Sequence, residues 1–391
     1  MKPELGHTLP ARREVAPRLD GASWKLGRLE VVGAGDDPIA RCIAGEMGDQ
    51  PRPTGTEHGR LSIRFVKPER TVNEVRVGPC SSRAYFISPD RIRVEDPMLS
   101  VTFNLAFDKV TLASKAGEWP RRTDSLLTRL RDIGYQPALV RAGKQFLYDS
   151  FNQLVQLRQL SMGQTWIHSS AVTKGERTVA LMAWGGTGKT STMLQLVRHD
   201  GWRFLADDLT VIDESGHVYR APHRLQMSAL NVEGDACLRK RVLAGRGPLD
   251  RFQWYERKWR RGAGHVRRRM HASELFGGDA IADEGQLTDA FFLRRVNRPS
   301  FNSRDISPEH AAALSSEVLH AELDPLCEMQ TAIFSSAVPV ELPGLQTIHN
   351  EAERILTSAF SSLRARCRLI DVPFGAGPSD LGSYFSRILE D

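Results

Sequence analysis

Long apolar runs and cysteines are both scarce in this sequence. No run approaches the roughly 18 apolar residues that a membrane-spanning helix needs, and the first twenty residues contain no apolar segment of the kind found in secretory signals. The five cysteines are odd in number, widely spaced and without a Cys-x-x-Cys pair: Cys42, Cys80, Cys237, Cys327 and Cys367. This pattern argues against a disulfide framework and a zinc site and is typical of free thiols in a reducing compartment. We therefore expect a cytoplasmic protein with no membrane segment.

The overall composition excludes a wholly disordered chain. Of 391 residues, 41% are apolar and 26% are charged, which are ordinary values for globular proteins. A chain of this length predicts two or three domains. The formal net charge of +6 is unevenly placed, because residues 239–269 contain twelve Lys or Arg and only two acidic residues.

Patterning along the chain predicts three segments. Residues 1–22 carry three prolines without periodicity and are expected to form an arm. Residues 23–120 contain short alternating apolar runs broken by Gly, Pro and Asp, which predict a smaller, mainly antiparallel β-rich domain. From residue 124 onward helical spacing takes over, and residues 121–391 are expected to form an α/β domain with a basic insert at about 237–270.

The most informative stretch lies between an apolar strand, TVALMA, and an amphipathic helix, KTSTMLQLVRH. The segment between them resembles the P-loop pattern GxxxxGK[ST], in which backbone N–H groups and a helix N-terminus surround phosphate oxygens. Ala183 stands where the first glycine belongs, a departure that is costly only if the position needs positive φ. The predicted nucleotide-binding residues are Gly185, Gly186, Thr187, Gly188, Lys189, Thr190 and Ser191. The motif implies ATP with Mg²⁺, although no base-reading motif separates ATP from GTP.

An acidic pair follows the phosphate loop closely. Asp207 and Asp208 come only eighteen residues after Lys189, at the end of the apolar run RFLA. Adjacent carboxylates at a strand end need a cation or hydrogen bonds to balance them. We expect one of them to hold magnesium and the other to accept the proton of an acceptor hydroxyl.

Together, IHSSAV, GGTGKTS and ADD resemble the HPr kinase/phosphorylase family, which shares its nucleotide-binding core with ATP-dependent phosphoenolpyruvate carboxykinase. The resemblance covers about residues 166–219, with weaker echoes in DAFFLRR and the C-terminal part. It implies an HPr-kinase-like α/β core with a mixed sheet. Because HPr kinases are oligomers, it also raises the alternative that this chain forms a homo-oligomer. The N-terminal strands resemble no family that we can name.

The resemblance also implies roles for individual residues. Lys189 would bind phosphates, Thr190 would bind magnesium, and Asp207 and Asp208 would divide the roles of metal ligand and base. His168 matches the family histidine near the transferred phosphate; the alternative is a histidine with a purely structural role in a half-buried strand. The family uses a C-terminal arginine near the active site, and the sequence does not choose among Arg267, Arg268, Arg269, Arg294 and Arg295.

The acceptor stays open at this point. A kinase acting on a seryl, peptide or small-molecule hydroxyl is the default that the resemblance implies. The basic stretch 239–269 also contains Phe252, Trp254, Tyr255 and Trp259, a mixture that can bind a polyanion. It is interpreted either as an exposed flexible insert or basic lid over the triphosphate, or as a nucleic-acid site, for example in a kinase for a hydroxymethylated base.

Two further functions compete with a kinase. In an ATPase or GTPase switch, water replaces the hydroxyl acceptor, and nucleotide turnover is indifferent to any acceptor. A nucleotide sensor binds ATP without turnover, and the substitution at Ala183 gives that alternative mild support.

Overall fold

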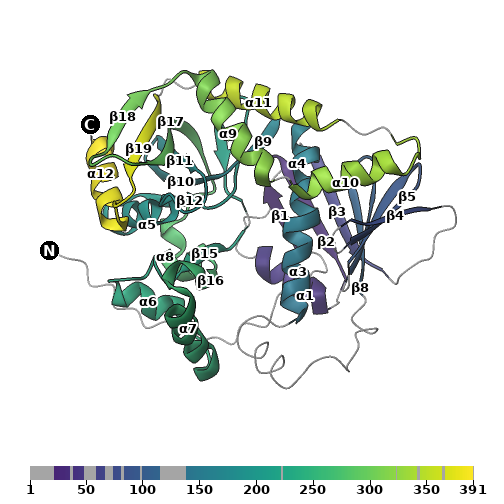
Figure 1. The fold of residues 1–391 in the computed structure, drawn as a ribbon, viewed down its shortest axis with the longest axis horizontal. Helices are drawn as coiled ribbons and strands as arrows, with labels where there is room; N and C mark the ends of the chain where they lie inside the picture. The colour runs from purple at the N-terminus through teal and green to yellow at the C-terminus, as the bar shows by residue number, and fades with distance from the viewer. Residues whose placement is uncertain are drawn as a thin grey trace.

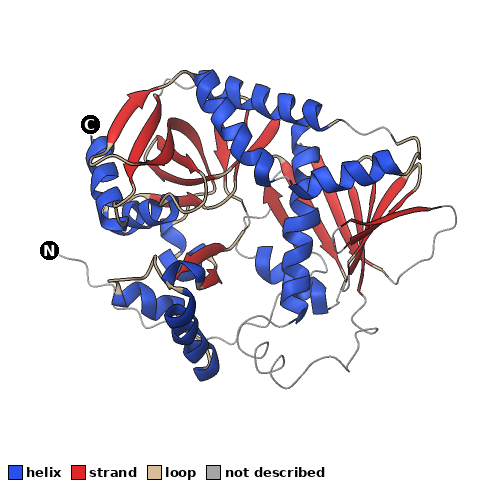
Figure 2. Cartoon of the chain, viewed as in Figure 1, coloured by secondary structure: helices blue, strands red, loops and turns tan. Residues whose placement is uncertain are grey.

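The computed structural model describes residues 22–35, 38–47, 59–66, 74–80, 83–96, 99–114, 138–221, 223–322, 324–340, 344–362 and 366–390. The expected arm, apart from its last residue, lies outside these ranges, and so does the start of the helical spacing expected from residue 124 onward. Within them the chain forms mixed α/β structure, with helices packed on two large sheets (Figures 1 and 2).

The N-terminal part forms an eight-stranded sheet in the order β1-β2-β3-β8-β7-β6-β5-β4. Its strands are β1 (Ala22–Leu26), β2 (Leu29–Ala34), β3 (Gly59–Phe65), β4 (Val75–Cys80), β5 (Arg83–Ile87), β6 (Arg91–Glu95), β7 (Leu99–Asn104) and β8 (Lys109–Ser114). Most neighbours are antiparallel, as predicted, but β3 is parallel to both β2 and β8. Helix α1 (Pro38–Met47) lies in the connection from β2 to β3, and such a crossover allows the parallel pairing.

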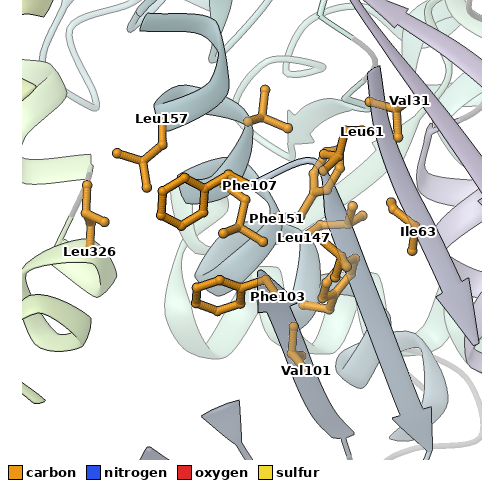
Figure 3. Packing of buried hydrophobic residues seen from close by; sticks show 14 of the residues in the cluster. Val31, Leu61, Ile63, Val101, Phe103, Phe107, Leu147, Phe151, Leu157 and Leu326 are labelled. Carbon is orange, nitrogen blue, oxygen red and sulfur yellow. The ribbon is translucent and has the colours of Figure 1, made fainter. Parts of the chain in front are cut away.

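One long helical segment packs against this sheet. It consists of α3 (Ala138–Phe146), a π-helical turn η1 (Leu147–Phe151) and α4 (Asn152–Leu160). Leu147, Phe151 and Leu157 from this segment join strand residues such as Phe103 and Ile63 in one apolar core (Figure 3). Single π turns inside α-helices occur often at functional sites, because they re-aim the side chains that follow.

The second sheet has nine strands, with β12-β10-β11-β17-β14-β13-β9 in one path and β18 and β19 joined through β17. Its strands are β9 (Gln164–Ile167), β10 (Ser169–Lys174), β11 (Arg177–Ala183), β12 (Arg203–Ala206), β13 (Thr210–Asp213), β14 (His217–Tyr219), β17 (Glu284–Val296), β18 (Asn302–Asp305) and β19 (Cys367–Pro373). Strands β11, β17 and β19 are parallel neighbours, whereas the other pairs are antiparallel. The sheet is therefore mixed, in agreement with the expected fold class.

Helices cover this sheet and continue toward the N-terminal part. They are α5 (Lys189–His199), α9 (Pro308–Glu322), α10 (Asp324–Ser335), α11 (Leu345–Ser361) and α12 (Pro378–Glu390). Helix α10 contacts β4 and β5, so the C-terminal half reaches back over the first sheet (Figure 1). The predicted domain boundary at residue 120 stays a prediction. Helices on both sides of it, α1 and α3, contribute residues to one apolar core.

The expected basic insert is a folded unit and not a flexible loop. Residues 237–270 form α6 (Ala236–Val242), α7 (Pro248–Arg261), a 3-10 turn η2 (Ala263–His265) and β16 (Arg267–Met270). The unit extends beyond the expected bounds, because β16 pairs with β15 (Leu225–Ser228), and α8 (Ala272–Phe276) and a second 3-10 turn η3 (Gly278–Ala280) follow it. Trp254 is fully buried and belongs to the same apolar cluster as Leu238 and Met270. Burial of a large aromatic ring stabilises the unit, and this explains why a strongly charged stretch holds a fixed shape.

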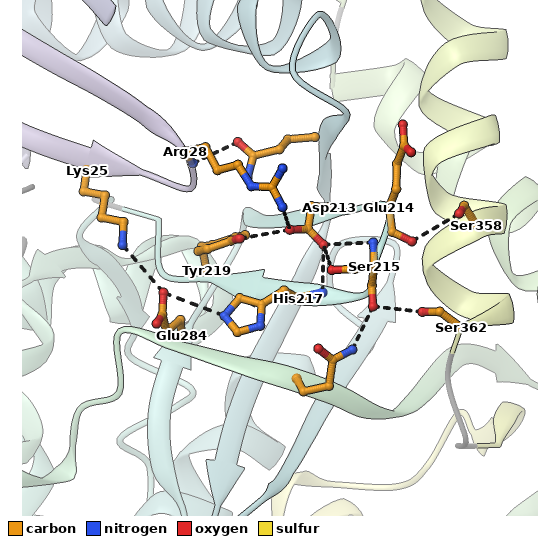
Figure 4. A network of polar contacts seen from close by, with 12 residues as sticks. Lys25, Arg28, Asp213, Glu214, Ser215, His217, Tyr219, Glu284, Ser358 and Ser362 are labelled. Atoms are coloured by element: carbon orange, nitrogen blue, oxygen red, sulfur yellow. Dashed lines mark hydrogen bonds and ion pairs between the residues drawn. The ribbon is translucent and has the colours of Figure 1, made fainter. Parts of the chain in front are cut away.

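A polar network joins the β1–β2 hairpin to the second sheet (Figure 4). The buried carboxylate of Asp213 accepts hydrogen bonds from Arg28 Nη2 at 2.8 Å, from the Tyr219 hydroxyl at 2.9 Å and from Ser215 Oγ at 2.6 Å. Burial alone would favour the neutral acid, but the hydrogen bonds, above all that of Ser215, lower the pKa of Asp213. The network therefore carries an ionised carboxylate between the two sheets.

Every helix in the described ranges is too short or too polar to cross a membrane. The described cysteines Cys42, Cys237, Cys327 and Cys367 form no disulfide, as the sequence predicts for those four.

Candidate active site

The phosphate-loop motif joins a central strand to a helix. β11 ends at Ala183, residues 184–188 form the loop, and α5 begins at Lys189. Gly186 and Gly188 have φ values of 80° and 108°, which only glycine adopts at low cost. A Cβ on Gly188 would overlap the side chain of Leu381, whereas Cβ atoms on Gly185 and Gly186 would meet nothing within 4 Å. The outer face of the loop thus has room for a ligand, and its inner face is closed by α12.

Lys189 lies at the mouth of this loop. Its side chain is buried, and Nζ donates to the carbonyl oxygens of Ala183 at 2.6 Å and Trp184 at 3.2 Å. The ammonium group and the N-terminus of α5 place positive potential at the same point, as an anion site requires. Ala183 is not among the described non-glycine residues with positive φ, so the missing first glycine costs nothing here.

Asp207 lies directly opposite the start of α5. Its buried carboxylate accepts a hydrogen bond from Thr190 Oγ1 at 3.1 Å and another from Ser170 Oγ on β10. Burial raises the pKa of Asp207 to about 6, although the bonds from Ser170 and Thr190 and the charge of Lys189 oppose the rise. A buried acid with a raised pKa beside a phosphate loop gains most from a bound cation.

Asp208 differs from Asp207 in backbone conformation and in exposure. Its φ is 75°, and Leu209 N donates to the carbonyl oxygen of Asp207 at 3.1 Å, so Asp208 is the central residue of a strained γ-turn. The turn leaves the Asp208 side chain 43% exposed, whereas Asp207 is buried. Strain of this kind persists only where the surrounding structure imposes it, and it is concentrated at functional sites.

His168 interrupts the run that the sequence predicts as one strand. It lies between β9 and β10, and its Nδ1 is 3.9 Å from Asp208 Oδ1. Burial lowers the pKa of His168 to about 4, and the charge of Lys189 adds to this effect. The ring is therefore neutral at pH 7, with one nitrogen that can donate and one that can accept a hydrogen bond.

Two other predicted residues complete the loop region. Thr187 Oγ1 donates to the carbonyl of Trp184 at 2.9 Å and so closes the loop on itself. Ser191 Oγ accepts from Asn231 Nδ2 at 3.0 Å, which ties α5 to the turn after β15.

Arg294 and Arg295 lie at the same sheet edge as the phosphate loop. β17 is parallel to β11 with Leu293 opposite Ala183, so both arginines follow at the carboxyl end of the strand. Arg294 Nε donates to Asp371 at 2.6 Å, and its side chain is half exposed. Arg295 Nη1 donates to the carbonyls of Pro373 at 2.6 Å and Ala376 at 2.9 Å. Arg295 thus supports the loop before α12, and Arg294 is the more accessible of the two.

The three consecutive arginines of β16 have three different environments. Arg267 is exposed and donates to Gln226 at 2.8 Å. Arg268 is buried, where it pairs with Asp250 and lies 5.1 Å from the centre of the Trp254 ring. Arg269 reaches the other way, with its guanidinium 4.3 Å from the centre of the Tyr148 ring. Arg268 is therefore a structural residue and not a candidate for substrate binding.

Two aromatic residues near Asp208 have no sequence motif to mark them. The rings of Tyr148, on the π turn, and His223 are 5.8 Å apart, and His223 Nε2 lies 3.0 Å from Asn152 Oδ1. Desolvation lowers the pKa of His223 to about 4, and the charge of Asp208 opposes this shift. Burial raises the pKa of Tyr148, and the charge of Asp208 adds to this rise.

The donor set beside the loop fits Mg²⁺. No group of three or more His, Cys, Asp or Glu able to hold a metal occurs in the described part of the chain. Mg²⁺ at a nucleotide site does not need one, because it takes one or two protein oxygens and completes its shell with phosphate and water. Thr190 Oγ1 and the Asp207 carboxylate are hard oxygen donors side by side at the start of α5.

Comparison with known proteins adds little to this geometry. No protein-family model and no curated protein matches the chain. One solved structure with detectable likeness is the Hpr(Ser) kinase/phosphatase from Coxiella burnetii, which is 12% identical over 36% of this chain and 78% of that one, with a TM-score of 0.22. The function is therefore argued from the site alone.

Proposed function

We propose that this protein is an ATP-dependent kinase that transfers the γ-phosphoryl group to an acceptor hydroxyl. One observation carries the proposal. The two carboxylates that follow the phosphate loop have separate environments, with Asp207 buried against Thr190 and Asp208 exposed on a strained turn beside His168. A nucleotide switch or sensor needs a metal ligand such as Asp207, but its function does not require an exposed carboxylate such as Asp208.

The residues divide the reaction as follows. The loop amides and Lys189 bind the phosphates, and the N-terminus of α5 adds its dipole. Asp208 accepts the proton of the acceptor hydroxyl as the acceptor oxygen bonds to the γ-phosphorus. The bond between that phosphorus and the β,γ-bridging oxygen breaks, and ADP leaves with the electron pair. Neutral His168 orients Asp208.

Thr190 and Asp207 would hold Mg²⁺, which when bound neutralises phosphate charge. Asp207 must be ionised for this role. Its pKa is raised to about 6, so below that pH Mg²⁺ binding would release the proton of the neutral acid.

Turnover of γ-labelled ATP with pooled hydroxyl-bearing peptides and small molecules tests the proposal. We expect label in an acceptor, lost in Lys189→Ala and in Asp208→Asn, and kept in Arg267→Gln as an exposed control. Release of free phosphate that no acceptor changes would favour an ATPase switch, and ATP binding without turnover would favour a sensor.

A nucleic-acid acceptor is a second candidate, and one face of α7 favours it. Phe252, Tyr255 and Trp259 recur at helical spacing and are exposed, Trp259 to 85%. Basic residues surround them on the same helix, at positions 251, 257, 258, 260 and 261. Rings that stack on unpaired bases beside cations that bind phosphates are the usual means of binding single strands.

Charge and aromatic substitutions on α7 separate this candidate from the default. If the acceptor is nucleic acid, Trp259→Ala and Arg261→Glu weaken labelling of single-stranded DNA or RNA. The loss in Arg261→Glu shrinks as salt rises, because salt screens the phosphate contact that the change removes. If peptides or small molecules are labelled and neither change affects them, the nucleic-acid candidate is wrong and the kinase proposal stands.

A further inference from the structure

A second group of charged side chains lies where α1 and α3 meet β16 and the segment before β15. Its centre is the buried carboxylate of Glu46 on α1. Arg269 Nη1 lies 3.3 Å from Glu46 Oε2, and Arg224 Nη1 lies 3.8 Å from Glu46 Oε1. Lys144, on α3, completes the group, and the charges of Glu46, Arg269 and Arg224 all act on it. We call these four residues the Glu46 cluster.

The cluster adjoins the proposed catalytic base through two rings. The Arg269 guanidinium lies 4.3 Å from the centre of the Tyr148 ring, which is 5.8 Å from that of His223. The charges of Asp208 and Arg269 both act on the pKa of Tyr148 and on that of His223. Arg269, Tyr148 and His223 therefore form one chain of contacts, supplied by β16, the π turn and the segment that enters β15, and the charge of Asp208 reaches both rings.

Positive charge exceeds negative charge in this cluster. Lys144, Arg224 and Arg269 carry a formal +3, which Glu46 reduces to +2. The nearby Arg246 adds to this excess, because it shares the carboxylate of Asp250 with Arg268, and two cations on one carboxylate leave a further +1. Burial lowers the pKa of Lys144; the charge of Glu46 opposes this shift and the neighbouring arginines add to it.

We infer that the Glu46 cluster is a subsite for a phosphate group that the acceptor carries beside its hydroxyl. The inference rests on the proposed function, because it makes the cluster part of the acceptor side of the active site. A phosphate monoester carries about −1.5 to −2 at pH 7, which matches the excess of +2. Guanidinium forks bind phosphate oxygens in pairs, and the lysine adds a point charge.

A plain structural tie is the competing explanation. Arg269 and Arg224 join β16 and the segment before β15 to α1, and such a tie would hold the basic unit against the N-terminal part. A structural ion pair needs only one cation for the Glu46 carboxylate, however, and it does not explain the presence of Lys144. It also predicts loss of stability without any effect on anion binding.

Calorimetric titration of the full-length protein with inorganic phosphate tests the subsite without turnover. Mg²⁺ and a non-hydrolysable ATP analogue first fill the phosphate loop, so that the titration reports a second site. We expect Arg269→Gln and Lys144→Gln each to weaken phosphate binding at least tenfold, and Arg267→Gln, on the same strand, to change it less than twofold. No binding to the filled wild-type protein, or equal binding by all three variants with unchanged melting temperatures, would overturn the inference.

Further probes define the ligand and separate this inference from the kinase proposal. Methyl phosphate binding more tightly than dimethyl phosphate indicates a phosphorylated small molecule or peptide, whereas the reverse order indicates a nucleic-acid backbone; acetate binding as tightly as either contradicts a phosphate subsite. Phosphate binding that depends on the cluster in a protein that transfers no phosphoryl group refutes the kinase proposal alone. Transfer whose acceptor KM is unchanged in Arg269→Gln and Lys144→Gln refutes the subsite alone.

Discussion

The hydroxyl of Thr190 lies 3.1 Å from the carboxylate of Asp207, across the gap between the start of α5 and the end of β12. The contact brings together the last motif residue of the phosphate loop and the first aspartate of the acidic pair. Because Asp207 is also held by Ser170, it is fixed in place before any cation arrives.

The first prediction is that Asp207→Asn stabilises the protein in the absence of metal and nucleotide. The folded-state pKa of Asp207 is about 6, above its ordinary value of 3.8, so the stability that the neutral acid gives is present below pH 3.8 and lost as pH rises through 6. At pH 7.5 we expect the variant to be about 2–3 kcal/mol more stable than the wild type in urea denaturation. At pH 4 the difference should nearly vanish, and a difference independent of pH would contradict the assignment.

The second prediction concerns strain at Asp208. Its φ of 75° disfavours any side chain with a Cβ and favours glycine. We expect Asp208→Gly to be about 1 kcal/mol more stable than Asp208→Ala, because the left-handed conformation costs an ordinary residue roughly 1–2 kcal/mol. Both variants should lose phosphoryl transfer. Equal unfolding free energies would show that the turn relaxes in the free protein.

The third prediction contrasts two glycines of one loop. Gly188→Ala adds a methyl group against Leu381 at a φ of 108°, and overpacking together with strain should cost about 2–4 kcal/mol. Gly185→Ala adds the same group in open space and should change stability by less than about 0.5 kcal/mol. It should nevertheless weaken ATP binding, since the methyl group occupies the space expected for phosphate. Calorimetry with ATP and thermal melts separates the two effects.

The fourth prediction distinguishes neighbouring arginines on β16. Arg268→Met leaves the buried carboxylate of Asp250 without its closest cation and should cost about 3–5 kcal/mol. Arg267→Met, at an exposed position, should cost less than about 0.5 kcal/mol. Comparable losses in both variants would mean that the pair with Asp250 is not a stabilising contact.

The sequence predicts the part of the site that one continuous stretch supplies. The strand, loop, helix and acidic pair lie within residues 177–208, and local spacing is enough to recognise them. The sequence does not show whether Ala183 is strained, because φ cannot be read from sequence. In the structure Ala183 has no positive φ. The strands were predictable for the same reason, since apolar alternation is a local signal, whereas the mixed sheet was expected from the family resemblance.

The acceptor side was not predictable, because distant segments build it. Glu46 and Arg269 are 223 residues apart along the chain and meet only through the packing of α1 against β16. Strand alternation puts Arg268 and Arg269 on opposite faces, but sequence alone does not say which face is buried. The π turn that carries Tyr148 interrupts a regular helical pattern without any Pro or Gly to mark it.

The most direct test of the kinase proposal combines ATP binding and transfer in Asp208→Asn. Once an acceptor is identified, we expect this variant to bind Mg²⁺-ATP within about threefold of wild type and to transfer phosphate at least about a hundredfold more slowly, as loss of a general base requires. Transfer at the wild-type rate, or ATP turnover that ignores the acceptor, would contradict the proposal that Asp208 activates a hydroxyl.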